Sequence, residues 1–321
     1  MFSIAAPLVL TSPKLTVHAS SPSIDKDLVS YSDINLLEFS LYLANFQSAF
    51  YRQGLANFTK SDFSAANFSA DFYTQLTTIA FNAQTHVTSF AATLKDLNAS
   101  TVAECTYDFN VTTPLGFVTT AGLIQGVAVS AYVGSLSTYK STALQTVAAS
   151  ILAVESRHSS YIRDAVGQQP FASPFETPLD LNEAYTLAEL FTPECPPSNP
   201  DFKTRTLPLD SGKAPENSTL SSSFSNHGVV GGNVTLLTFG YNVRPANGST
   251  QVYAAFLTIT GPVFAPATPV PGLGFNVTVP SAPKGYVPIN GFTYVVLTSS
   301  KTTLRDEDIL AGPATLEIYL E

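Results

Sequence analysis

A glutamate and a histidine three residues apart, Glu155 and His158, are the residues of this sequence whose types and spacing are best suited to chemistry. They lie in segment 141–167, where residues of one face recur at alternating steps of four and three. This spacing predicts a helix with Glu155 and His158 in the middle of its inward face. The other inward positions are Leu144, Ala148, Ile151 and Ile162. An inward Glu-x-x-His pair is how a helix bundle presents two ligands to one metal ion.

Three further long helices are expected to position this pair. Their apolar periodicity predicts helices over 33–54, 70–97 and 115–138, followed by a short fifth helix over 181–191. Four long helices with short to medium connections are typical of a four-helix bundle. At the level of Glu155, the other helices place inward Ala44, Ala83 with His86, and Gln125.

This residue set does not match a di-iron carboxylate bundle. Such a bundle needs a Glu from each of two helices and a Glu-x-x-His pair from each of the other two. Here the level holds one carboxylate, two imidazoles and one amide, which do not neutralise two hard cations. The interpretation we favour is a metal-free hydrogen-bonded network around Glu155, because a buried charge needs such partners.

Two alternatives stay open for the same residues. His86, Glu155 and His158, with Gln125 beside them, form a two-histidine, one-carboxylate set that suits one iron, zinc or manganese ion in a mononuclear oxidase or oxygenase. Alternatively, the small side chains of Ala44 and Ala83 open an apolar cavity that holds a small molecule.

Composition and charge narrow the classes of partner. The 321-residue chain is 45% hydrophobic and only 12% charged, with a net charge of −9. The acidic balance argues against nucleic acid and anionic membrane surfaces as partners. The longest nearly uncharged stretch, 121–136, is too short to span a bilayer, so we expect no membrane span.

Eight Asn-x-Ser/Thr sequons together predict a secreted glycoprotein that carries N-linked glycans. Their asparagines are Asn57, Asn67, Asn98, Asn110, Asn217, Asn233, Asn247 and Asn276. In an extracellular compartment we expect Cys105 and Cys195 to form a disulfide. Residues 1–19 resemble a signal peptide weakly, because the apolar run 2–10 has no cationic segment before it.

The periodicity of the sequence divides the chain into three regions. Residues 1–30 have no clear period and are expected to form an extended arm, and residues 31–200 form the helical bundle. From residue 201 the period changes from 3.6 to 2, which predicts strands. The expected strands lie in 234–241, 252–260, 275–279, 292–298 and 314–320. The predicted fold class is therefore α+β, with a four-helix bundle followed by an all-β, immunoglobulin-like sandwich over 201–321.

Several runs of sequence resemble a known family. They are LYLANFQSAFYRQGL (41–55), IAFNAQTHVTSF (79–90), LIQGVAVSAYVGS (123–135), AASILAVESRHSSYIRDAVG (148–167) and PFETPLDLNEAYTLA (174–188). These runs closely resemble fungal ferritin-like proteins that are grouped with stress-responsive and desiccation-related proteins. The resemblance implies a ferritin-like bundle, secretion or surface association, and an all-β tail.

The same resemblance shows where this chain departs from the family. Relatives with the full ligand pattern have Glu where this chain has Ala44, Ala83 and Gln125, whereas His86, Glu155 and His158 match. The departure argues against iron oxidation or storage. We therefore expect a non-catalytic, structural or stress-protective role at the cell surface or in the extracellular matrix, with self-association or binding to cell-wall or matrix components.

Overall fold

The computed structural model describes residues 24–202, 229–230, 233–237, 243, 251–271, 274–281, 283 and 288–319. Most of the expected N-terminal arm, including residues 1–19, lies outside the described residues. The same holds for Asn217 and Asn247, and for Asn233 only the backbone is described. A short 3-10 helix, Lys26–Leu28, precedes the helical part of the chain.

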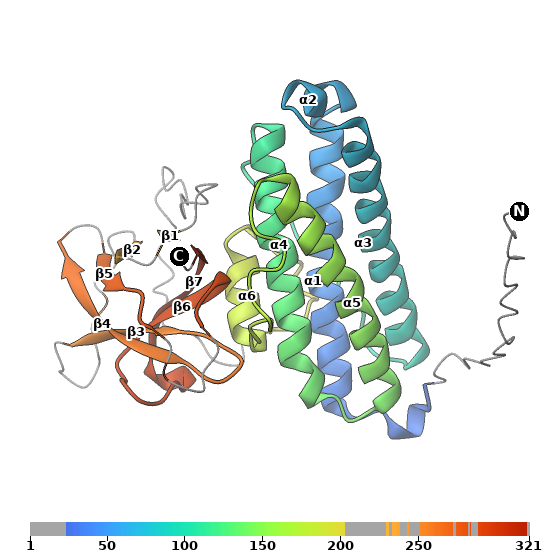
Figure 1. The fold of residues 1–321 in the computed structure, drawn as a ribbon. Coiled ribbons are helices and arrows are strands. Elements are labelled where there is room, and N and C mark those ends of the chain that lie inside the picture. The colour runs from blue at the N-terminus through green and yellow to red at the C-terminus, as the bar shows by residue number, and fades with distance from the viewer. Residues whose placement is uncertain are drawn as a thin grey trace, which may run out of the picture.

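Four long helices form an antiparallel bundle (Figure 1). They are α1 (Tyr31–Asn57), α3 (Ala70–Asp96), α4 (Pro114–Ser135) and α5 (Thr142–Ala165). The short helix α2 (Lys60–Ala65) joins α1 to α3 at one end, and α6 (Leu181–Glu189) packs against α4. All the predicted helices are confirmed with ends shifted by a few residues, whereas α2 lies in a segment expected to be a polar link.

Local sequence explains where these helices begin. Ser30, Ser69 and Ser141 each accept a hydrogen bond from a backbone N–H in the first turn of α1, α3 and α5. Pro114 begins α4, where the missing N–H has no cost and the fixed φ suits a helix. These caps fix where each helix begins, and therefore the position of its inward side chains along the bundle axis.

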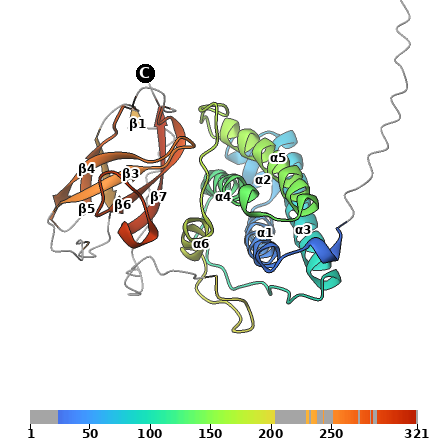
Figure 2. The ribbon, with the colours of Figure 1, turned by 90° about the horizontal axis from the view of Figure 1, so that it is seen from below.

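The buried face of α5 matches the predicted face, from Leu144 to Ile162. By contrast, α1 and α4 are buried on nearly all sides, because α6 packs against both helices (Figure 2). The sheet also covers α4, and the connection between α3 and α4 also covers α1. The helix with its extension, Pro114–Thr138, is long and apolar enough to cross a membrane by length and composition alone. However, 72% of its most apolar window is buried inside the fold, as in a core helix.

The predicted disulfide between Cys105 and Cys195 is confirmed. It ties the connection between α3 and α4 to the segment after α6, where the backbone N–H of Thr106 also donates to the carbonyl of Glu194 at 2.8 Å. The two cysteines are 90 residues apart, and closing a loop of this length stabilises the fold by about 4 kcal/mol on a chain-entropy basis.

The C-terminal region forms a β-sheet, which confirms the α+β class. The strands are β1 (Val229–Val230), β2 (Asn233–Leu237), β3 (Val252–Phe256), β4 (Val263–Val270), β5 (Gly274–Thr278), β6 (Gly291–Thr298) and β7 (Ile309–Tyr319). Their order is β1-β7-β6-β3-β4-β5-β2, and every neighbouring pair is antiparallel except β1 with β7. The strands of the described part therefore belong to one hydrogen-bonded sheet, whereas the sequence led us to expect two packed sheets.

The sheet packs directly against the helical region. The Arg163 guanidinium on α5 makes two contacts with the Glu317 carboxylate on β7, at 2.6 and 2.9 Å. The Tyr294 hydroxyl on β6 donates to Ser130 Oγ on α4 at 2.9 Å. Gly126 lies against the Phe292 ring, with which any Cβ would collide. The division at residue 200 stays a prediction, but the core of the helical region includes Tyr294.

The beginning of α6 yields a prediction about pH dependence. Glu183 is 8% exposed, and its carboxylate accepts from the Asp180 N–H at 2.9 Å. Burial, the Asp180 charge and the nearby Asp306 raise the pKa of Glu183 to about 8, against the effect of its backbone hydrogen bond. Because the pKa is raised in the folded state, the protonated Glu183 side chain contributes to stability. This contribution is fully present below about pH 4.5, the ordinary pKa, and is lost as pH rises toward 8.

We therefore expect Glu183→Gln to make the free energy of unfolding less dependent on pH between 4.5 and 8. The amide retains an oxygen that accepts from the Asp180 N–H, so the helix cap survives. Urea unfolding, monitored by circular dichroism at several pH values, measures how steeply the free energy of unfolding changes with pH. An unchanged slope in the variant would show that Glu183 does not titrate in this window.

Candidate site at the centre of the bundle

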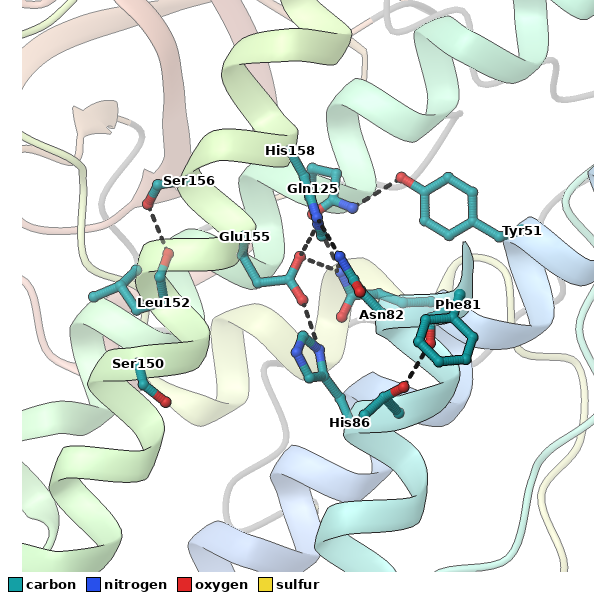
Figure 3. A network of polar contacts seen from close by, with 12 residues as sticks. Tyr51, Phe81, Asn82, His86, Gln125, Ser150, Leu152, Glu155, Ser156 and His158 are labelled. Carbon is teal, nitrogen blue, oxygen red and sulfur yellow. Dashed lines mark hydrogen bonds and ion pairs between the residues drawn. The ribbon is translucent and has the colours of Figure 1, made fainter. Parts of the chain in front are cut away.

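The predicted residues meet in one polar network inside the helical bundle (Figure 3). Glu155 and His158 come from α5, His86 from α3 and Gln125 from α4. The structure adds Gln47 and Tyr51 from α1 and Asn82 from α3. All four long helices therefore contribute a side chain, as in a bundle that holds a metal centre.

Glu155 is the centre of the network and is 1% exposed. His86 Nδ1 lies 3.1 Å from one carboxylate oxygen, and His158 Nδ1 lies 3.6 Å from the other. Gln47 Nε2 donates to the second oxygen at 3.2 Å. Burial alone would raise the pKa of Glu155, but the contacts and charges of His158 and His86 outweigh it and hold the pKa at about 2. Glu155 is therefore a carboxylate at neutral pH.

The two imidazoles face Glu155 from different helices. The Nδ1 atoms of His86 and His158 are buried, and neither has the alignment of a hydrogen bond to the carboxylate or to another group. Both imidazoles therefore lie close to the carboxylate without an aligned hydrogen bond to it. His158 Nε2 lies 3.2 Å from Asn82 Nδ2, so the outer edge of this ring also has a polar neighbour. The His86 and His158 side chains are 12% and 11% exposed, so solvent reaches part of each ring although Glu155 between them is buried.

Amides complete the network on the side of α1 and α4. Gln47 Nε2 lies 3.4 Å from Gln125 Oε1, and Gln125 Nε2 donates to the Tyr51 hydroxyl at 2.8 Å. Burial raises the pKa of Tyr51 well above its usual range, so its hydroxyl stays neutral. The amides therefore supply hydrogen bonds where carboxylates would supply charge.

Gln47 was not predicted from the sequence, because Ala44 was the residue of α1 expected at the level of Glu155. Gln47 follows Ala44 by three residues, one helical turn, and this spacing is the signal that could have found it. Since α1 is buried on nearly all sides, its apolar period does not single out one face. Ser48, the next residue along α1, donates to Gln84 Oε1 of α3 at 2.9 Å.

The donor set does not fit a di-metal centre. In such a bundle four carboxylates hold two hard cations, whereas Glu155 is the one carboxylate of this network. Across the described ranges, no group of three or more His, Cys, Asp and Glu side chains is arranged to hold a metal ion. A single ion on His86, Glu155 and His158 stays a prediction, since the two Nδ1 atoms face the same carboxylate.

The apolar-ligand alternative also stays a prediction. Ala44 and Ala83 are buried, at 1% and 3% exposure. Two small pockets of the described residues lie beside Tyr132 and beside Phe175, each with a cavity volume of about 10 Å³. Pockets for small organic ligands are typically about 300 Å³ or larger.

Comparison with known proteins agrees with the arrangement of the helices. Residues 32–168 match the family model of the ferritin-like domain. This four-helix part of the chain is a ferritin-like domain. The match ends just after α5, so α6 and the sheet lie outside it. No curated protein matches the chain.

Proposed function

We propose that this protein is a secreted, non-catalytic glycoprotein with a structural or stress-protective role at the cell surface or in the extracellular matrix. In this proposal its ferritin-like domain keeps the helical frame and replaces the di-metal centre with the network around Glu155. The desiccation-related family that the sequence resembles, and the fungal origin that this resemblance implies, belong to the same proposal.

The charge of the central network carries this proposal. Its one carboxylate lies between His86 and His158, and Gln47 donates to it at 3.2 Å. Gln47 and Gln125 contact each other through their amides, which bring no negative charge to neutralise a cation. Both oxygens of the Glu155 carboxylate therefore have polar neighbours within the protein itself.

Three properties support secretion. A disulfide persists in oxidising compartments such as the extracellular space. The chain carries eight sequons. The asparagines whose side chains are described, Asn57, Asn67, Asn98, Asn110 and Asn276, are all exposed. Exposure is what the attachment of a bulky, hydrated glycan requires.

Assembly and wall binding test the proposed role. We expect the purified full-length chain to self-associate in analytical ultracentrifugation or to sediment with an insoluble cell-wall fraction. The control is the protein unfolded by urea and reductant, then alkylated and dialysed, which should lose any binding that needs the fold. A strictly monomeric protein that binds no wall or matrix fraction would contradict the structural role.

The main alternative is a mononuclear metal-dependent oxidase or oxygenase. It is favoured by the two Nδ1 atoms that face Glu155 without aligned hydrogen bonds. It predicts oxygen consumption by the purified protein and loss of that activity in His158→Ala. Asn82→Ala is the matched control, because Asn82 contacts His158 Nε2 on the side away from the carboxylate. No oxygen consumption with either iron or manganese, the two redox-active ions of the set, would count against this alternative.

A further inference from the structure

Three sequons gather at the end of the bundle that carries α2 (Figure 1). Asn57 is the last residue of α1, Asn67 lies between α2 and α3, and Asn110 precedes α4. Contacts between rings confirm that α2 and α4 meet, because the ring centres of Phe63 on α2 and Phe117 on α4 are 6.1 Å apart. All three asparagines are exposed.

The same end of the bundle carries a cluster of aromatic rings that its own helices do not fully cover. Phe63 is fully buried at the middle of the cluster and contacts Phe58, Phe68, Phe72, Tyr73 and Phe117. Phe58, Phe68 and Tyr73 are only partly buried. Tyr161, which stacks on Phe72, is 39% exposed. Water therefore reaches several faces of an otherwise apolar cluster.

Two of the sequons are directly joined to this cluster. The middle residues of Asn57-Phe58-Thr59 and Asn67-Phe68-Ser69 are the partly buried rings themselves. A sugar on either asparagine therefore begins next to a ring that the protein leaves partly uncovered. Asn110 approaches from the beginning of α4, close to the buried Phe109.

We propose that N-linked glycans on Asn57, Asn67 and Asn110 form a sugar cap over the α2 end of the bundle and shield its partly exposed aromatic rings. This inference depends on the proposed secretion. The donor is a lipid-diphosphate-linked oligosaccharide. The asparagine amide nitrogen loses a proton and bonds to the anomeric carbon, while the bond from sugar to phosphate breaks. The lipid diphosphate leaves with the electron pair of that bond, and the proton is released with it. The cap prevents this end of the bundle from associating through its rings.

Asn98 provides a matched control. It is also exposed and lies in a sequon, but it follows α3 at the opposite end of the bundle. Asn67, Asn98 and Asn110 all have positive φ, at 67°, 56° and 45°. Glycine accepts this conformation without strain, so Asn67→Gly, Asn110→Gly and Asn98→Gly remove the acceptors with equivalent backbone effects. Asn57 lies in helix α1, where Asn57→Gln is conservative.

The experiment expresses the full chain in a secreting eukaryotic host and measures site occupancy by glycopeptide mass spectrometry. We expect sugar on Asn57, Asn67 and Asn110. The triple variant N57Q/N67G/N110G should bind more bis-ANS and shift to larger species in size-exclusion chromatography, whereas N98G should behave as the parent protein. Treating the folded parent protein with an endoglycosidase should reproduce the shift, which separates shielding from any effect on folding.

Two results would overturn the cap without touching the proposed secretion. One is a secreted protein with sugar at Asn98 or Asn276 but none at the three capping positions. The other is a glycosylated protein whose dye binding and size do not change when its sugars are removed. A chain that the host retains and leaves without sugar at any sequon would overturn both the cap and the proposed secretion.

Discussion

Replacing Glu317 by Gln is expected to lower the free energy of unfolding by about 3–5 kcal/mol, since breaking a buried ion pair leaves an uncompensated charge. The Arg163 and Glu317 side chains are only 8% and 2% exposed. Arg163 also donates to the carbonyl of Gln169 at 2.8 and 3.0 Å, so its position is fixed and it has little freedom to turn toward water. The pair joins α5 to β7, so its loss should loosen the sheet from the ferritin-like domain.

The control for this prediction removes both charges. Arg163→Met with Glu317→Leu leaves no buried charge, and we expect this double variant to be closer to the parent protein than Glu317→Gln is. Urea unfolding followed by circular dichroism measures the three proteins. A loss of about 1 kcal/mol or less in Glu317→Gln would mean that the pair behaves as a solvent-exposed ion pair.

Acid is expected to destabilise the ferritin-like domain through Glu155. The contacts with His158 and His86 hold its pKa at about 2, below the ordinary value of 4.5. Because the pKa is lowered in the folded state, ionised Glu155 stabilises the fold above about pH 4.5. This contribution is lost as pH falls from 4.5 toward 2. The difference between the two pKa values corresponds to about 3 kcal/mol at 1.36 kcal/mol per pH unit.

Glu155→Gln separates this effect from general acid denaturation. The amide has nearly the same shape but does not titrate, so the variant should lose less stability than the parent protein between pH 4.5 and 2. Its free energy of unfolding at neutral pH should be lower than that of the parent, because the contacts with two imidazoles lose their charge. If the free energy of unfolding fell equally with pH in the two proteins between pH 4.5 and 2, the central role of Glu155 would be contradicted.

Sequence alone predicted the parts of the site whose helices have one buried face. The steps of four and three residues along α5 placed Glu155 and His158 inward, and α3 placed His86 inward in the same way. An amphipathic helix shows its buried face in its sequence, because only that face must be apolar. The Cys105–Cys195 disulfide followed from the expected compartment and is present.

Three features could not be predicted from local sequence patterns. Helix α1 is buried on nearly all sides, so its apolar pattern does not mark one face, and the choice between Ala44 and Gln47 needed the neighbouring helices. Strand β4 contains Pro266 and Pro269, and proline in an interior strand argues against a strand on sequence grounds. The single sheet depends on long-range pairing, such as β3 with β6 and β1 with β7, which local periodicity does not specify.

The metal content of the protein tests the central claim most directly. The measurement is plasma mass spectrometry on protein purified without chelator, before and after incubation with iron, zinc or manganese, beside His158→Ala treated in the same way. A metal-free network around Glu155 predicts far less than one ion per chain in every sample and no difference between the two proteins. About one ion per chain in the parent protein that is absent from His158→Ala would contradict it and support a mononuclear metal centre on His86, Glu155 and His158.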